Sequence, residues 1–289
     1  EGSGIVVDIG SDVKKIKKGD KVILHWIKGS GIESETPKYY YRNKIINAGL
    51  VTTFNEYAVV SENRITKITK NYPMDKACLY GCAIPTAYGL IKNEIINNIK
   101  NNFYKKNKIY IAVFGAGGIG LLIIQAIKFY IKNSYVIAVD VKRSSLKKAE
   151  LFGADICLNS KLKKYEEILD NNLKLKVNIS IDTTGNKKII EKGVSILTAE
   201  GICYLMGVPN KRYMMKFNGW HIMHNRTVKG CLGGNCFTDS DLPYFMNLDR
   251  TGKIDIKKII SAKFNFKDIN KAINFFESSK SSGRILLKF

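Results

Sequence analysis

An α/β fold built on a doubly wound parallel β-sheet, with a β-rich region before it, is predicted for this chain of 289 residues. After about residue 75, short apolar runs alternate with stretches of helical period, which is typical of a parallel sheet with helices on both faces. Before residue 70, short apolar runs are separated by closely spaced glycine turns, which indicates a β-rich region. The change of rhythm predicts two domains.

The elements follow from these patterns. In the β-rich region, strands are expected at 5–9, 21–24 and 56–60, with an irregular polar lobe over 28–50. A helical stretch is expected over 75–91, with Asp75 as its cap and a division at Pro85. The parallel strands are expected at 109–114, 135–139, 178–182 and 202–206. Helices are expected at 118–131, 144–152, 163–173 and 187–198. A helix over 268–278 and a strand over 284–289 end the chain.

The turn after the strand at 109–114 carries the strongest functional signal. Gly115, Gly117 and Gly120 have the G-x-G-x-x-G spacing, with Gly118 and Ile119 between them. In such turns the first glycine permits the tight bend, the second lets a diphosphate approach the backbone, and the third packs helix against strand. The amides of the helix N-terminus then receive the phosphate charge. The turn predicts a dinucleotide site.

Asp140 indicates which dinucleotide binds. It ends the next apolar strand, 20 residues after Gly120. An acid there bonds the ribose 2′-hydroxyl of NAD and repels a 2′-phosphate, so NAD is the predicted cofactor. Lys142 and Arg143 follow and would soften that preference. Thr184, just after the strand that ends at Asp182, is expected at the same edge of the sheet, where ligands of such folds bind.

Composition limits the partners and the compartment. The net charge of +22 comes from lysine spread along the chain, so no nucleic-acid partner is predicted, although the charge favours anionic ligands. The uncharged run Ile109–Ile127 divides into strand, glycine turn and helix, so no membrane span is predicted. None of the six cysteines forms a C-x-x-C pair, which favours a reduced, cytoplasmic protein.

Motifs along nearly the whole chain resemble the zinc-containing alcohol dehydrogenase branch of the medium-chain dehydrogenase/reductase superfamily. The resemblance is carried by Glu1-Gly2-Ser3-Gly4 with Gly10 and Val13, Lys18–Val22, Gly81-Cys82 with Thr86–Gly89, Gly207-Val208-Pro209, Arg226–Gly230, and Arg284 before the terminal Phe289. It implies a GroES-like catalytic domain, present in part, over 1–83 and 233–289. It also implies a Rossmann NAD-binding domain over 84–232. The chain begins at the Glu of the family's Gly-His-Glu signature, which suggests an N-terminally incomplete sequence.

The same resemblance implies the chemistry of a catalytic zinc, which acts as a Lewis acid on the substrate oxygen. Cys82 matches one of three zinc ligands, and the other two would lie before Glu1 in a full-length protein. A small buried apolar role is the alternative for Cys82. Glu1 matches the acid beside the metal. The lobe that carries a structural zinc in many members has no cysteine here, so no structural zinc is expected. His25 is expected to be a packed core or pocket histidine and not a metal ligand, because no second ligand lies at a plausible spacing.

The resemblance also assigns roles around the cofactor and the substrate. Thr86 is expected near the nicotinamide and Ile119 against the cofactor. Val208 would offer a backbone contact to the carboxamide. Arg284 would pair with the diphosphate, because its planar fork matches phosphate oxygens. Trp26 matches a pocket-lining aromatic residue, with ordinary core packing as the alternative.

The expected function is hydride transfer between NAD and an alcohol, with polyols or sugar-like alcohols among the options. One alternative is a zinc-independent NAD(P)H oxidoreductase like the quinone reductases, which Glu1, Cys82 and Asp140 disfavour. Another is a truncated cofactor-binding chain without activity. The resemblance further implies a small-molecule alcohol or carbonyl substrate and a homodimer or homotetramer.

Overall fold

The computed structural model describes residues 1–101, 108–162, 176–278 and 281–289, so the helix expected over 163–173 lies outside the described residues. The chain forms two compact units. The first comprises Glu1–Pro85, Cys236–Ala272 and Ile285–Phe289, and the second comprises Thr86–Asn235 and Ile273–Arg284. The predicted domain boundaries after residues 83 and 232 stay a prediction.

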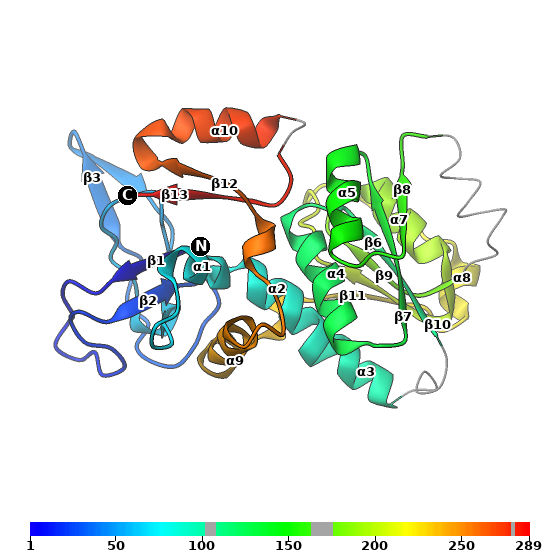
Figure 1. Cartoon of the computed structure of the whole chain (residues 1–289), viewed down its shortest axis with the longest axis horizontal. Helices are drawn as coiled ribbons and strands as arrows, with labels where there is room; N and C mark the ends of the chain where they lie inside the picture. The colour runs from blue at the N-terminus through cyan, green and yellow to red at the C-terminus, as the bar shows by residue number, and fades with distance from the viewer. Residues whose placement is uncertain (102–107, 163–175, 279–280) are drawn as a thin grey trace. The chain divides into compact units, whose positions relative to one another are not determined.

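A six-stranded sheet with the strand order β11-β10-β9-β6-β7-β8 forms the centre of the second unit (Figure 1). Its strands are β6 (Ile109–Phe114), β7 (Ser134–Asp140), β8 (Ile156–Asn159), β9 (Val177–Asp182), β10 (Leu197–Leu205) and β11 (Thr227–Gly230). All of its pairings are parallel. The order runs outward from β6 in both directions, and ligands of such sheets bind outside the carboxyl ends of the strands at this point. This arrangement confirms the predicted fold class.

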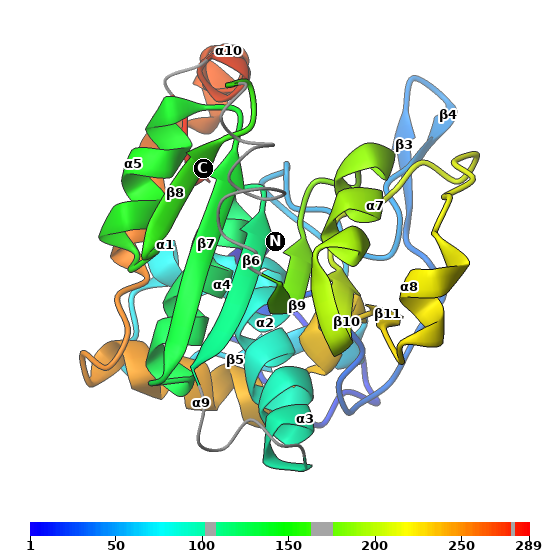
Figure 2. The ribbon, with the colours of Figure 1, turned by 90° about the vertical axis from the view of Figure 1, so that its right-hand side faces the viewer.

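Helices cover both faces of this sheet (Figure 2). α4 (Gly118–Tyr130) and α5 (Arg143–Leu151) lie on one face, and α7 (Lys187–Ser195) lies on the other. The unit also contains α3 (Ile96–Asn101), the π-helical turn η3 (Leu90–Ile95), α8 (Gly219–Met223) and η6 (Leu232–Asn235). The helix expected over 187–198 ends early because Leu197 already pairs with Val177 as the first residue of β10.

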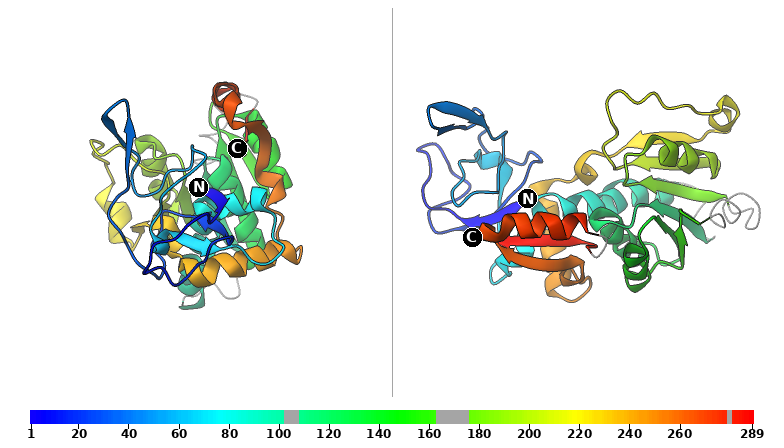
Figure 3. Two further views of the ribbon diagram at one scale, coloured as in Figure 1. Left: turned by 90° about the vertical axis from the view of Figure 1, so that its left-hand side faces the viewer. Right: turned by 90° about the horizontal axis from the view of Figure 1, so that it is seen from above.

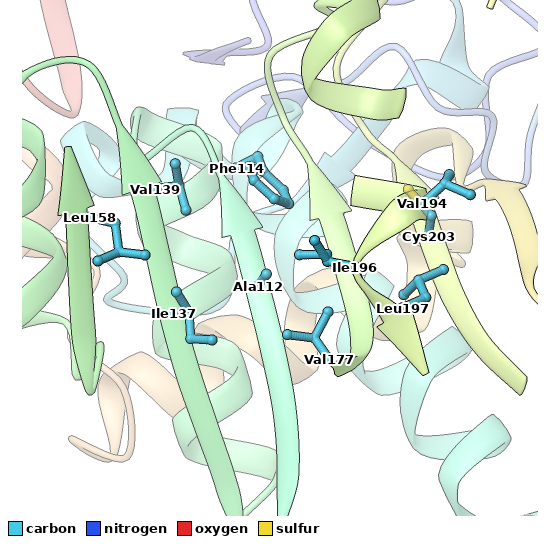
Figure 4. Close-up of a cluster of buried hydrophobic side chains, with 10 residues drawn as sticks. All are labelled: Ala112, Phe114, Ile137, Val139, Leu158, Val177, Val194, Ile196, Leu197 and Cys203. Atoms are coloured by element: carbon cyan, nitrogen blue, oxygen red, sulfur yellow. The ribbon is translucent and has the colours of Figure 1, made fainter. Parts of the chain in front are cut away.

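The core beneath α7 explains why the sequences of these strands are continuous apolar runs. Alternate residues of β6 and β7, such as Phe114 and Val139, point to this face and pack with Val194 of α7 (Figure 4). The residues between them, such as Val113 and Ala138, are also fully buried. A parallel sheet with both faces covered has no solvent face, so its strands need no polar alternation.

The first unit is β-rich and holds three small sheets among the described residues. β1 (Gly2–Ile5), β2 (Lys21–Leu24) and β5 (Ile65–Lys67) form one, and β12 (Ile260–Asn265) with β13 (Arg284–Lys288) forms another. β3 (Lys38–Tyr41) and β4 (Lys44–Asn47) form a hairpin that projects from this unit (Figures 1 and 3). It lies inside the segment expected to be an irregular lobe.

Two expected strands of this unit are wrong. Only Ile5 of the run 5–9 belongs to a strand, and residues 56–60 form none. Tyr57 and Val59, the apolar members of the second run, are 73% and 67% exposed. The sequence alternation is present there, but no neighbouring strand supplies the hydrogen bonds that a sheet requires.

The stretch expected as one divided helix over 75–91 is broken further. It contains α1 (Met74–Ala77), η2 (Cys78–Gly81) and α2 (Ala83–Gly89), and Pro73 rather than Asp75 is the N-cap of α1. Cys82 separates η2 from α2 because its φ of −156° is not helical. Elsewhere in the described part of the chain lie η1 (Glu62–Arg64), α9 (Thr238–Arg250), η7 (Lys257–Ile259), η8 (Phe266–Asp268) and α10 (Ile269–Glu277).

Asp249, on α9, joins segments of the first unit that lie far apart in the sequence. Its buried carboxylate accepts hydrogen bonds from the Tyr72 hydroxyl (2.6 Å) and the Lys76 ammonium (2.9 Å) through Oδ2. Its Oδ1 accepts a bond from the Ile256 amide (2.9 Å). All three donors lose a partner if this acid is removed, so we regard it as a structural centre of the unit.

We predict that Asp249→Asn lowers the free energy of unfolding by about 3 kcal/mol, because the new amide leaves at least one of these donors unsatisfied. Urea unfolding at neutral pH measures the change. Asp255→Asn is the matched control: this side chain is half-exposed and lies 3.9 Å from Lys258 Nζ, so a change within about 0.5 kcal/mol is expected. Equal effects of the two substitutions would contradict the role of Asp249.

Candidate dinucleotide site

The turn between β6 and α4 has the backbone shape that the glycine pattern predicts. Gly115 adopts a φ of +91°, which side chains disfavour, and Gly117 is the N-cap of α4. No side chain caps this helix, so its first amides remain available to an anion. The Thr183 hydroxyl, 3.0 Å from the carbonyl oxygens of both Phe114 and Gly115, holds the turn in place.

The three glycines have different physical roles. A Cβ on Gly120 would lie 1.8 Å from the Gly115 carbonyl oxygen, so a side chain here cannot fit without moving the strand or the helix. A Cβ on Gly117 would meet no heavy atom within 4 Å. The structure therefore needs Gly120 for packing, whereas the space beside Gly117 is open to a ligand.

Asp140 lies at the carboxyl end of β7, beside this turn. Its Oδ2 accepts the amide hydrogen of Ala116 (2.7 Å), and its Oδ1 accepts that of Lys142 (2.7 Å). Each carboxylate oxygen has a second lone-pair direction, so the group can accept further bonds from ribose hydroxyls. The turn and the acid thus fit the adenosine half of a dinucleotide.

Arg284 lies against the first turn of α4. Its Nε is 2.8 Å, and the Gly283 carbonyl oxygen 3.1 Å, from where a Cβ on Gly118 would be. Gly118 therefore permits the close approach of this late segment to the helix N-terminus. The guanidinium adds positive charge at the end of the helix where the dipole already favours an anion.

The end of β9 lies beside the end of β6. Asp182 accepts bonds from the Thr184 hydroxyl (2.6 Å) and from the amides of Thr184 (3.1 Å) and Gly185 (2.9 Å). The Thr184 hydroxyl thus serves the local turn. A Cβ on Gly185 would lie 2.5 Å from the Val208 carbonyl oxygen, while Val208 itself is 93% exposed. Ile119 and Thr86 are half-buried.

Glu1 and Cys82 lie together in the first unit. The Glu1 Oε2 accepts the amide hydrogen of Ala83 (2.9 Å), and a Cβ on Gly81 would lie 2.8 Å from the Glu1 Cβ. Cys82 is half-buried. Zinc needs at least three protein ligands, and the described residues contain no group of three His, Cys, Asp or Glu side chains that could hold a metal. A complete zinc site therefore does not fit the described residues.

His25 is fully buried in the first unit. Its Nδ1 lies 2.7 Å from the Ile27 carbonyl, which can only accept, so Nδ1 carries the proton and Nε2 accepts from the Thr66 hydroxyl at 2.9 Å. Burial lowers the pKa of His25 to about 4, and it is therefore a neutral packed residue. Trp26 beside it is 39% exposed, and its carbonyl accepts a bond from the Arg64 guanidinium.

Some contributors to the site were missed by sequence reasoning. Thr183 holds the glycine turn, but of the two adjacent threonines only Thr184 was predicted to belong to the site. The Ala116 amide binds Asp140, which no side-chain pattern reveals. A hydroxyl residue after the strand that pairs with β6 is a signal that would have found Thr183.

Comparison with protein families decides the assignment. The zinc-binding dehydrogenase model matches residues 118–248, and the alcohol dehydrogenase GroES-like domain model matches residues 1–70. Together they cover more than half of the chain. The chain belongs to the zinc-type alcohol dehydrogenase family of the medium-chain dehydrogenase/reductase superfamily. It is therefore an oxidoreductase of the alcohol dehydrogenase family by descent, as the sequence motifs predicted.

Solved structures of such dehydrogenases share this fold. Benzyl alcohol dehydrogenase from Acinetobacter calcoaceticus is 24% identical, covers 94% of this chain and 78% of its own, and has a TM-score of 0.76. An alcohol dehydrogenase from E. coli CFT073, solved with the cofactor NADH, is 22% identical. It covers 99% of this chain and 82% of its own, with a TM-score of 0.75. 2R,3R-Butanediol dehydrogenase from Bacillus subtilis is 23% identical, covers 99% of this chain and 79% of its own, and has a TM-score of 0.71.

No helix among the described residues has the length and apolar character needed to cross a bilayer.

We predict that Gly117→Ala folds like the parent but weakens NADH binding about tenfold or more, because the added methyl occupies the space where the diphosphate approaches the backbone. Gly120→Ala should lose stability as well as binding, owing to its overlap with Gly115. Thermal unfolding and NADH fluorescence titration separate the two effects. Gly230→Ala, where a Cβ also meets nothing within 4 Å, is the control. Normal NADH affinity in Gly117→Ala would refute this placement.

We predict that His25 makes stability depend on pH. The unfolded chain binds its proton near pH 6.5 and the folded chain near pH 4, so the unfolded state holds more protons between these values. The free energy of unfolding should therefore fall by about 3 kcal/mol as the pH drops from 7 to 4. His25→Gln should reduce this slope. Parallel slopes for both proteins, in chemical unfolding at several pH values, would show that His25 does not titrate in this way.

Proposed function

We propose that this protein transfers a hydride between an alcohol and NAD. The observation that supports the cofactor is the glycine turn, with its open space beside Gly117 and the Asp140 carboxylate at the next strand end. The E. coli neighbour was solved with NADH, and two other neighbours act on benzyl alcohol and butanediol, as their names state. These likenesses support a small alcohol or carbonyl compound as the substrate.

Each residue of the proposed site has a task that its position supports. The first amides of α4 and the Arg284 guanidinium would bind the diphosphate. Asp140 would bind the adenosine ribose and oppose a 2′-phosphate. Thr86 and the Val208 backbone would orient the nicotinamide, which accepts or gives the hydride when bound. Orientation matters here because hydride transfer needs the two carbons in close, aligned contact.

The zinc part of the function is a proposal for Cys82 alone. Cys82, with Glu1 near it, is the zinc ligand that the family resemblance assigns to this chain, and a thiolate is a preferred ligand of that metal. The described residues do not complete the zinc site. We also propose a cytoplasmic homodimer or homotetramer, from the family resemblance.

We predict that the protein binds NADH more tightly than NADPH, and that Asp140→Ala weakens NADH binding while narrowing the preference between the two. Removal of the acid deletes the ribose contact and also the repulsion of the 2′-phosphate. Fluorescence titration with each cofactor measures both. Asp155→Ala is the control: Asp155 is an acid just before β8, the strand next to β7, and its partners are Lys128 and the Val136 amide.

The reaction is tested on the same preparation with NAD and a panel of primary, secondary and vicinal alcohols. Reduction of quinones is tested separately with NADH and with NADPH. Oxidation of an alcohol supports the proposal. NADPH-dependent quinone reduction without alcohol oxidation would favour the zinc-independent reductase instead. NADH binding without turnover of any compound would leave a cofactor-binding protein, and failure to bind NADH would refute the proposal itself.

A further inference from the structure

Lys148 makes a contact that none of the roles above explains. It lies on α5, and its ammonium donates a hydrogen bond to the carbonyl oxygen of Ser282, 2.5 Å away and 134 residues later in the chain. Among the described residues no carboxylate forms an ion pair with it. Burial also lowers the pKa of Lys148, so its charge is held where water only partly solvates it. A half-buried cation of this kind needs a structural or functional reason.

The segment that Lys148 holds leads directly to the proposed cofactor site. Ser282 is buried, and Gly283 follows with a φ of +110°. Gly283 and Arg284 then lie against Gly118, the first residue of α4. All of these residues belong to the second compact unit. The hydrogen bond from Lys148 is thus two residues away from the guanidinium at the helix N-terminus.

Two further features indicate that this bond fixes the backbone path of the segment. The Ser282 hydroxyl is buried and has no hydrogen-bond partner among the described residues, so the side chain of Ser282 does not anchor the segment. The left-handed glycine next to it is the most permissive residue for the backbone to rotate about. The carbonyl of Ser282, immediately before that glycine, is therefore an effective point at which to fix the path of the chain.

We infer that Lys148 is a positioning residue of the dinucleotide site: its bond to the Ser282 carbonyl holds the Ser282–Arg284 segment on the first turn of α4, so that Arg284 meets the diphosphate. The inference rests on the proposed function. Lys148 acts through Arg284. The ligand is the diphosphate of a dinucleotide. It would bind more tightly to an Arg284 guanidinium that is already held in place than to a mobile one.

The test compares Lys148→Met, which keeps the length and apolar stem but removes the donor, with Lys148→Arg, which keeps a donor. Lys147→Met is the matched control, because Lys147 is exposed on the same helix. Hydrogen exchange of residues 281–288 reports the positioning without any cofactor. NADH titration reports the consequence, and the same substitutions in an Arg284→Met background show whether the effect passes through the guanidinium.

The expected result is faster exchange of residues 281–288 and an approximately tenfold higher Kd for NADH in Lys148→Met, with partial recovery in Lys148→Arg. Lys147→Met should resemble the parent. In the Arg284→Met background, Lys148→Met should raise the Kd much less, since the two residues act as one unit.

Unchanged exchange in Lys148→Met would overturn the positioning role, whatever the cofactor. Equal fold losses with and without Arg284 would also overturn it, since Lys148 would then act on its own. If the parent binds no NADH while exchange still rises in Lys148→Met, the proposed function fails and Lys148 is only a structural tie, which overturns the inference as well.

Discussion

The contact between Gly120 and the carbonyl oxygen of Gly115 is the constraint on which the second unit depends. The helix α4 begins so close to the end of β6 that a single methyl at residue 120 would overlap the Gly115 carbonyl oxygen, just after the strand. This closeness puts the first amides of α4 at the carboxyl edge of the sheet, where a diphosphate can reach them. It also explains the positive φ at Gly115, because the chain must reverse direction within a few residues.

Acids on the two strands beside β6 stabilise this turn from opposite sides. Asp140 at the end of β7 binds the Ala116 amide, and Asp182 at the end of β9 binds the turn that carries Thr183 and Thr184. Thr183 then completes the link back to Gly115. In a chain of net charge +22, these few acids are bound to backbone amides, and they fix loops in place. Glu62 does the same in the first unit, where it binds the amides of Lys14, Lys15 and Ile32.

The sequence predicted the parallel sheet well because both of its faces are buried, which leaves uninterrupted apolar runs such as Ile109–Phe114. It predicted the glycine turn equally well, because only glycine tolerates the backbone at residue 115 and the contact at residue 120. Prediction failed where the structure depends on partners distant in the sequence. Residues 56–60 alternate like a strand but lack a neighbour, and the hairpin at 38–47 carries no strong turn signal, since Arg42 and Asn43 adopt left-handed conformations without glycine. The hydrogen bonds donated by the Thr183 hydroxyl and the Ala116 amide could not be predicted from the sequence either.

The return of the chain to the second unit sets a limit on how its site can be assembled. Residues 273–284 belong to that unit although the chain has passed through the first unit between residues 236 and 272. Arg284 therefore reaches the N-terminus of α4 only after most of the chain has been made. The continuous segment 86–235 contains the glycine turn and Asp140, but it lacks the guanidinium and the carbonyl that Lys148 holds. The glycine turn and the residues that hold it all lie within residues 86–235, whereas the cationic side of the proposed site exists only when both ends of the second unit have come together.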